Sequence, residues 1–295
     1  MFVSAIEIAS GYTRAIHTIS RNIDRTEIFP GAATLFFVNS DGWALTCRLV
    51  VELLIGSDNL QKRKNDYLND LTAIKGKKNE RQLKRELLKK YDYIKNPIYE
   101  IYNCFMNCVD GNLQYEIFMH PELDIALIHF VNYTSLTCNV FPVFAKNGDN
   151  LKQGKYLCRL GFPFPEFTNY FYDSNEEKIK WNQSGRIDSP IFPIEGMVTR
   201  HLADANQKII GFEMSTPGLR GQSGGPVFDQ NGIIWGMQFA TNHLDLDFDI
   251  KQEVSRNGKK TKVEDHAFLH VGHCIHVNAL KEFMNSKNVQ FQEEN

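Results

Sequence analysis

Gly221-Gln222-Ser223-Gly224-Gly225-Pro226 is the stretch of this sequence that decides the fold, and Val227-Phe228 follows it directly. A serine hydroxyl is a weak nucleophile at neutral pH, so it needs a base to accept its proton and donors to hold the oxyanion. Glycines on both sides of Ser223 let the backbone turn sharply and aim several amides at one point. The string therefore predicts a nucleophilic serine, with the amides of Gly221 and Ser223 as oxyanion donors. The structural alternative is a glycine-rich hairpin with an incidental serine.

The rest of the chain is rich in short β-strand patterns. Ala33–Val38 is a β-rich run, Asn39-Ser40-Asp41-Gly42 is a hairpin turn signal, and Trp43–Cys47 returns as a second strand. Asp124 opens a nearly continuous apolar run, Ile125–Val131. Further short strands are expected at Leu113–Met119, Tyr156–Gly161, Gly196–His201, Ile209–Met214 and Ile233–Ala240. Many short strands separated by turn residues predict an all-β barrel or sandwich, and an apolar stripe after Val277 predicts a final helix.

These motifs resemble the trypsin-like serine peptidases of the chymotrypsin fold, especially the cytosolic bacterial type. The resemblance covers about residues 29–285 apart from a basic insertion. In that family a histidine follows a hairpin of the type Phe36–Thr46, an aspartate opens a strand such as Asp124–Leu127, and the serine lies in the glycine string. The resemblance thus implies a catalytic triad at position 49, Asp124 and Ser223. It also implies two six-stranded antiparallel β-barrels with the site between them.

The sequence departs from this family at the general-base position. Thr46-Cys47-Arg48-Leu49-Val50 carries leucine where the histidine is expected. Leucine cannot accept a proton, and in another serine protease the loss of the histidine alone costs about 10⁶ in turnover. The sequence therefore predicts a serine endopeptidase that is nearly inactive as written, as an engineered or natural variant. The alternative is a natural pseudopeptidase that binds a peptide or a partner.

None of the nine histidines is a convincing substitute for the missing base. His120 lies four residues before Asp124 and is the first candidate, whereas His129 is expected to be a barrel residue. His270, His273 and His276 are spaced by three, which is compatible with a metal site. Their context indicates a strand that enters the last helix, so we expect no metal and no cofactor. The six cysteines are scattered, and we expect them to be reduced.

Two positions near Ser223 bear on substrate preference. In secreted relatives an aspartate before the nucleophile captures a freed N-terminus, but here that position is Gln222. Pro217 lies six residues before Ser223, at the position that often forms the pocket floor, and Gln238-Phe239-Ala240 is the expected opposite wall. Because no acidic residue marks this pocket, we expect a neutral or apolar P1 side chain.

An insertion at about 57–98 differs from the β-rich remainder. Twelve lysines and arginines lie between Lys62 and Lys95, against five acidic residues. An apolar stripe of Leu83, Leu87, Tyr91 and Ile94 predicts one or two helices. These helices either pack on the domain as a solvated element or present a basic surface to a polyanion or a regulatory partner. Residues 245–265 are charged and are expected to form a mobile loop.

The expected organisation is an N-terminal extension (1–28), a first barrel carrying the insertion (29–145), a second barrel (146–275), and a C-terminal helix with tail (276–295). A net charge of −2 gives no general attraction to nucleic acid, so a protein or peptide substrate is the expected partner. No stretch approaches the roughly 18 apolar residues of a membrane span. The N-terminus lacks the apolar core of a signal peptide, which favours a cytoplasmic protein.

Overall fold

The computed structural model describes residues 2–256 and 259–295 of the chain, and its first sheet contains six antiparallel strands. Their order is β4-β1-β2-β3-β6-β5. The strands are β1 Thr13–Asn22, β2 Ile28–Phe37, β3 Trp43–Thr46, β4 Ile98–Phe105, β5 Val109–Met119 and β6 Ala126–Leu136. The described residues show no pairing between the edge strands β4 and β5, so this sheet is an open, curled half-barrel. The hairpin expected at 33–47 and the strand after Asp124 are confirmed.

The second sheet contains a closed antiparallel barrel. Its strands run in the order β13-β8-β11-β12-β15-β14, and an additional β13–β14 pairing closes the ring. They are β8 Tyr156–Arg159, β11 Ile194–Ala203, β12 Ile209–Met214, β13 Pro226–Phe228, β14 Ile233–Arg256 and β15 Lys259–His276. Two short strands, β7 Val143–Phe144 and β16 Gln292–Glu293, extend the sheet through parallel pairing, and β9 Tyr170–Asp173 with β10 Lys178–Trp181 forms a separate ribbon. The predicted all-β fold class, a double β-barrel with added helices, is confirmed.

One continuous apolar core joins both sheets to the terminal helices. Helix α1 Val3–Tyr12 buries Ala5, Ala9 and Tyr12, and helix α4 Val277–Ser286 buries the stripe expected from its sequence. The start of the chain therefore requires a correction. Residues 1–28 were expected to form an extension, but β1 pairs with both β2 and β4 inside the first sheet. The remaining domain boundaries, at 145/146 and 275/276, stay predictions.

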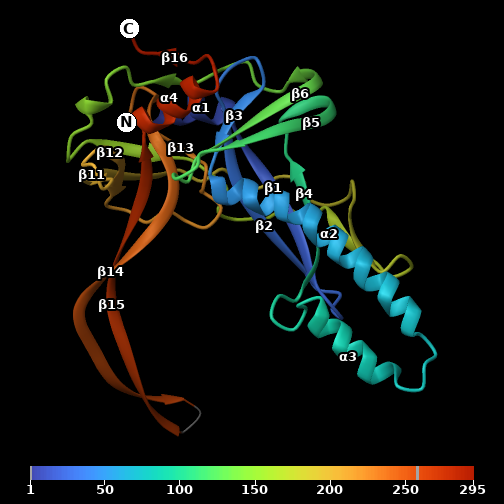
Figure 1. Cartoon of the computed structure of the whole chain (residues 1–295). Helices are drawn as coiled ribbons and strands as arrows, with labels where there is room; N and C mark the ends of the chain where they lie inside the picture. The colour runs from blue at the N-terminus through green and yellow to red at the C-terminus, as the bar shows by residue number, and fades with distance from the viewer. Residues whose placement is uncertain (1, 257–258) are drawn as a thin grey trace.

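A long two-stranded ribbon replaces the loop expected at 245–265. Strands β14 and β15 continue beyond the barrel, pair with each other from Gly236–His276 to Arg256–Lys259, and project from the body of the protein (Figure 1). Asp245 to Asp249 interrupts the register with a bulge. Residues 257 and 258 of the expected loop lie outside the described residues.

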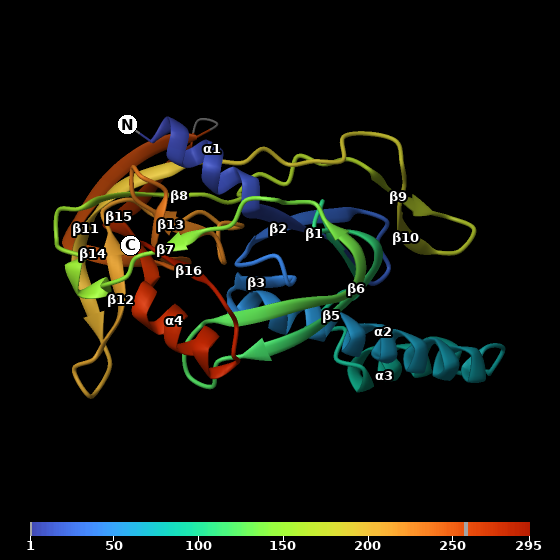
Figure 2. The ribbon, with the colours of Figure 1, turned by 90° about the horizontal axis from the view of Figure 1, so that it is seen from above.

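The basic insertion forms two helices, as expected, although the first begins earlier than position 57. Helix α2 spans Arg48–Ile74 and helix α3 spans Glu80–Lys90. The pair extends away from the barrels (Figures 1 and 2). Tyr67, Tyr93 and Tyr99 form a small separate core beneath it. Two residues of the predicted stripe, Leu87 and Tyr91, pack against this core, whereas Ile94 is exposed.

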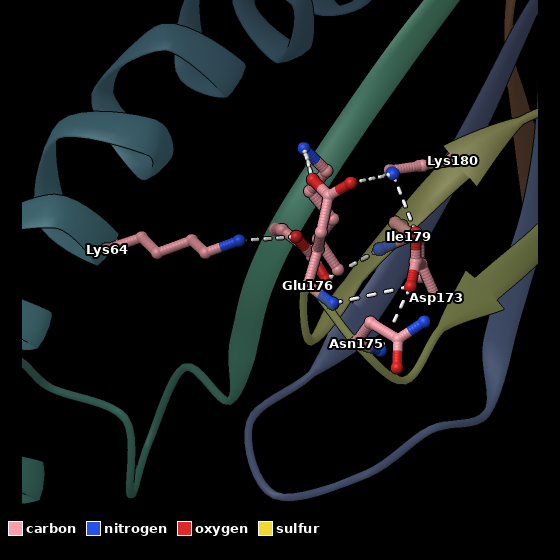
Figure 3. A network of polar contacts seen from close by, with 8 residues as sticks. Lys64, Asp173, Asn175, Glu176, Ile179 and Lys180 are labelled. Carbon is pink, nitrogen blue, oxygen red and sulfur yellow. Dashed lines mark hydrogen bonds and ion pairs between the residues drawn. The ribbon is translucent and has the colours of Figure 1, made fainter.

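A buried carboxylate connects the insertion to the barrel. Glu100 on β4 is 1% exposed and accepts from Arg21 Nε at 2.6 Å and Lys64 Nζ at 2.5 Å. It also accepts from the main-chain N–H of Ile179 at 3.1 Å. Figure 3 shows Lys64 of α2 reaching toward β4 beside the β9–β10 ribbon, where Lys180 binds Asp173 at 2.6 Å. One acidic group thus joins β1, β4, α2 and β10.

Candidate functional site

Positions 49 and 124 are in direct contact at the start of α2. Cys47 precedes the helix in an extended conformation, and Leu49 lies in the first helical turn. Oδ1 of Asp124 accepts the main-chain N–H of Leu49 at 2.8 Å. Burial raises the pKa of the Asp124 carboxyl above its ordinary value, and the amides of Leu49 and Arg48 partly oppose this by bonding to the charged form. The aspartate is therefore positioned beside residue 49, whose own side chain is 54% exposed.

The Ser223 loop meets the same helix start through strand β14. The carbonyl of Gln238 accepts the N–H of Gly224 at 2.9 Å and the thiol of Cys47 at 3.3 Å. The next carbonyl along β14, that of Phe239, accepts the Ser223 hydroxyl at 3.3 Å. The Gln238 carbonyl thus accepts hydrogen bonds both from Gly224, which follows Ser223, and from Cys47, which lies two residues before Leu49. The structure thus places Asp124 against residue 49 and links the serine loop, through β14, to the residue two before it.

The glycine cradle around Ser223 is set by close backbone approaches. Gly224 has φ +86, and a Cβ there would lie 2.1 Å from the carbonyl oxygen of Thr34. Gly221 has φ +97, and its Cβ would lie 2.4 Å from the carbonyl oxygen of Phe162. Thr34 on β2 also donates its N–H to Ser223 O at 3.1 Å and its hydroxyl to Gly221 O at 2.7 Å. The loop is therefore fixed to the first sheet by its carbonyls, in a conformation that only glycine adopts easily.

The amides of this loop are divided between structural bonds and free donors. The N–H groups of Gln222, Gly224 and Gly225 donate to main-chain carbonyls. Within the described part of the chain, no acceptor is recorded for the N–H of Gly221 or of Ser223. These are the two donors expected to hold an oxyanion. Because such groups normally find a partner, their free state is compatible with a developing negative charge as the missing acceptor.

Three of the histidines considered as a replacement base, His120, His129 and His276, contact other groups within the described structure. His120 Nδ1 accepts the main-chain N–H groups of Glu122 and Leu123 at 3.1 and 2.9 Å, within its own loop. His129 stacks on Trp43 at 4.0 Å. His276 caps α4, and burial lowers its pKa to about 4. The described residues contain no cluster of His, Cys, Asp or Glu able to hold a metal ion.

The predicted pocket residues converge on an arginine that the sequence analysis missed. Gln238 is buried, and its Oε1 accepts from Arg159 Nη1 at 2.5 Å while its Nε2 donates to the carbonyl of Ala240 at 2.6 Å. Thr216, next to Pro217, accepts from Arg159 Nη2 at its carbonyl (2.6 Å) and at its hydroxyl (2.5 Å). An arginine inside the apolar run Tyr156–Gly161 was the signal that could have revealed it. Phe239 contributes the carbonyl that accepts from Ser223.

Comparison with known proteins gives a likeness in structure only. No protein-family model and no curated protein matches the chain. Among solved structures, it is similar to a mutant of Rv3671c from M. tuberculosis H37Rv in its inactive form, with a TM-score of 0.46, 11% identity, and coverage of 96% of this chain and 89% of that one. It is also similar to the HtrA-type protease AlgW with a decapeptide, with a TM-score of 0.47, 11% identity, and coverage of 97% and 67%. For the AlgW complex with a tripeptide, the TM-score is 0.46 and the identity is 11%, with coverage of 97% of this chain and 63% of that one.

The two sheets and the apolar core that joins them form the double β-barrel described above. No helix within residues 2–256 and 259–295 is long and apolar enough to cross a bilayer.

Proposed function

We propose that this chain is built as a trypsin-like serine endopeptidase and is nearly inactive as it stands, because Leu49 occupies the general-base position. Ser223 is the nucleophile, Asp124 is the group that would orient the base, and the amides of Gly221 and Ser223 would bind the oxyanion. The observation that carries the proposal is the contact of Asp124 with residue 49 beside a serine loop whose two expected oxyanion donors are free.

The missing step is the transfer of the serine proton. Attack of Ser223 Oγ on a peptide carbonyl requires that its proton leave, and the Leu49 side chain has no atom that can accept it. A histidine at this position would donate one ring N–H to Asp124 and accept the serine proton at the other nitrogen. Without it, only oxyanion binding and substrate binding remain, which in another serine protease leave about 10³-fold acceleration over water.

The direct test is a reversion. Leu49→His protein is incubated with an unfolded protein substrate and with a fluorophosphonate probe that labels activated serines. We expect both cleavage and labelling to rise by at least about 10³ over the unmodified chain. Leu49→Gln, which adds a polar group but no base, is the matched control, and Leu49→His with Ser223→Ala must lose both signals. A folded Leu49→His protein that neither cleaves nor labels would refute the endopeptidase assignment.

A second candidate function is peptide binding without cleavage, as a pseudopeptidase. The observation that favours it is the exposed Leu49 side chain, which adds apolar surface in the first turn of α2 beside Asp124. Under this alternative the unmodified chain binds peptides, and Leu49→His weakens that binding and leaves the bound peptide uncleaved. Binding is measured by fluorescence anisotropy with labelled peptides. Restored cleavage without detectable binding by the unmodified chain would exclude it.

The insertion and the cellular location also remain proposals. Exposed basic residues on α3 support a regulatory protein partner at the insertion, with nucleic acid not expected. A cytoplasmic location remains the expectation from the sequence.

A further inference from the structure

A pocket of about 590 Å³ lies against one face of β1. Thr13, Ala15 and His17 all line it. Because side chains two residues apart on a strand share a face, this face of β1 forms one wall, and Phe162 and residues 188–191 belong to the others. None of the three proposed triad positions is among the described residues that line it. The pocket is therefore separate from the proposed catalytic site, and its volume is typical of a site for a small molecule.

Arg14 brings a fixed positive charge to this pocket. Its guanidinium donates to four main-chain carbonyls, from Nε to Asn107 at 2.6 Å, from Nη1 to Ser10 and Thr13 at 3.3 and 2.9 Å, and from Nη2 to Thr137 at 3.1 Å. All four acceptors are neutral, and within the described part of the chain no ion pair of Arg14 with a carboxylate is recorded. One Nη2 hydrogen is left for a further acceptor. An anion in the pocket would meet a cation that is already held in place.

A buried pair further along β1 has one hydrogen to spare. His17 is 0% exposed, and its Nε2 lies 2.9 Å from Oγ of Ser189, which also lines the pocket. Burial lowers the pKa of His17 to about 4, so the ring is neutral near pH 7. A neutral imidazole and a hydroxyl carry two polar hydrogens, and their mutual bond uses one. The other, on His17 Nδ1 or on Ser189 Oγ, has no acceptor recorded among the described residues. A ligand oxygen would satisfy it.

Asp188 adds a negative charge at the His17 end of the pocket. It lines the same pocket, and its charge acts on His17, where it raises the pKa against the larger effect of burial. Its side chain is 70% exposed, and its Oδ1 lies 3.5 Å from Nε of Arg186. Arg186 also pairs with Glu166, so one arginine faces two carboxylates. Asp188 can therefore accept a second cation.

The two charges and the remaining lining select the ligand. Arg14 and His17 are three residues apart on β1, which is about 10 Å along an extended strand, and an extended peptide of two or three residues has a similar span. Met106, Pro190 and Ile191 add apolar surface to the pocket. The pocket thus offers a cation, an anion about one short peptide away, and apolar surface between them.

We propose that this pocket binds a short peptide of two or three residues with free termini and apolar side chains. The terminal carboxylate pairs with Arg14, the terminal ammonium pairs with Asp188, and a peptide carbonyl accepts the spare hydrogen of the His17–Ser189 pair. The site does not involve Ser223 and is independent of the proposed catalytic function.

Calorimetric titration of the unmodified full-length chain tests the assignment. The probe is Ala-Leu-Ala with free termini, compared with its N-acetylated form and its C-terminal amide. We expect the amide to bind about tenfold more weakly than the free peptide, because a charge-assisted bond to Arg14 is lost. The acetylated form should bind about threefold more weakly, since Asp188 is exposed to solvent. Equal binding of all three peptides, or no binding by any of them, would overturn the assignment.

Two variants assign the ends of the peptide. Asp188→Asn should remove the penalty for acetylation and keep the penalty for amidation, and Arg14→Met should do the converse. Arg81→Met, at an exposed position on α3, is the matched control and should change neither. If Arg14→Met does not fold, Asp188→Asn still decides, because its side chain is exposed. Binding that responds to neither variant would place the peptide elsewhere, and would overturn this site while leaving the proposed endopeptidase untouched.

Discussion

Replacing Glu100 by glutamine should destabilise the protein far more than a surface substitution of the same kind. The carboxylate is 1% exposed and is the shared partner of Arg21 and Lys64, which are 4% and 7% exposed. Glu100→Gln keeps the size of the side chain but leaves two buried cations facing a neutral group. Breaking a buried ion pair in this way costs about 3–5 kcal/mol, a large part of the 5–15 kcal/mol that stabilises a typical domain.

The measurement is urea unfolding at pH 7, followed by tryptophan fluorescence and circular dichroism. The matched control is Glu282→Gln, since Glu282 binds Lys208 at 2.5 Å with both side chains more than half exposed, and such pairs contribute about 1 kcal/mol or less. Adding Lys64→Met to Glu100→Gln should recover part of the loss, because one unpaired cation is removed. If Glu100→Gln costs no more than Glu282→Gln, the network does not hold the insertion on the barrel.

Four further outcomes follow from the structure. Burial lowers the pKa of His17 from 6.5 to about 4, so the folded protein keeps this side chain neutral, and about 3 kcal/mol of stability should be lost as the pH falls from 6.5 to 4. His17→Gln should reduce that loss when the free energy of unfolding is measured against pH. An unchanged dependence of stability on pH would contradict this prediction. Gly224→Ala should lower the free energy of unfolding, measured with denaturant, by more than about 2 kcal/mol, because the added Cβ would lie 2.1 Å from the main-chain oxygen of Thr34. A smaller decrease would mean that the serine loop moves to accept the methyl group. Asp124→Asn in the unmodified chain should leave the melting temperature at pH 7 unchanged or raised, because the pKa of the Asp124 carboxyl is raised in the folded state. Any gain should fade as the pH falls through that raised pKa and be gone below 3.8, and a clear loss at pH 7 would show a structural role. Arg81→Glu with Arg85→Glu should lower the salt concentration that elutes the protein from a polyanion column, and unchanged elution would exclude α3 as the basic surface.

The sequence predicted those parts of the fold that depend on local signals. The hairpin at 33–47 has a turn of Asn, Ser, Asp and Gly between two apolar strands, and such patterns need no distant partner to be recognised. The serine loop was predicted for the same reason, since its glycines report a backbone conformation directly. The contact between Leu49 and Asp124 was expected through the family resemblance, and the structure places the two together.

Features that depend on distant partners were missed. Strand β1 carries Arg14 and Arg21 and was assigned to an N-terminal extension, but Arg21 is buried because it pairs with Glu100 of β4. Arg159 was missed for a similar reason, since its partners lie on segments far along the chain. In the β14–β15 ribbon, the alternation in Leu244–Asp249 was itself a strand signal. The mobile loop predicted at 245–265 rested on the charge of this segment and not on its alternation of apolar and acidic residues, and that prediction was wrong.

The retained parts of the site are those that a purely structural role would not require. Glycines held at positive φ against backbone oxygens, free amides at Gly221 and Ser223, and an Asp124 carboxyl whose burial opposes ionisation each lower the stability of the fold. An oxyanion would be the partner of the free amides at Gly221 and Ser223, and a charged base would be the partner of the Asp124 carboxyl. Aiming those amides at an oxyanion would also explain why the glycines are held at positive φ. In the proposed site Leu49 stands at the position of the general base, and its half-exposed side chain can be exchanged without repacking the core. A histidine at this one surface position therefore tests the whole arrangement with little risk to folding.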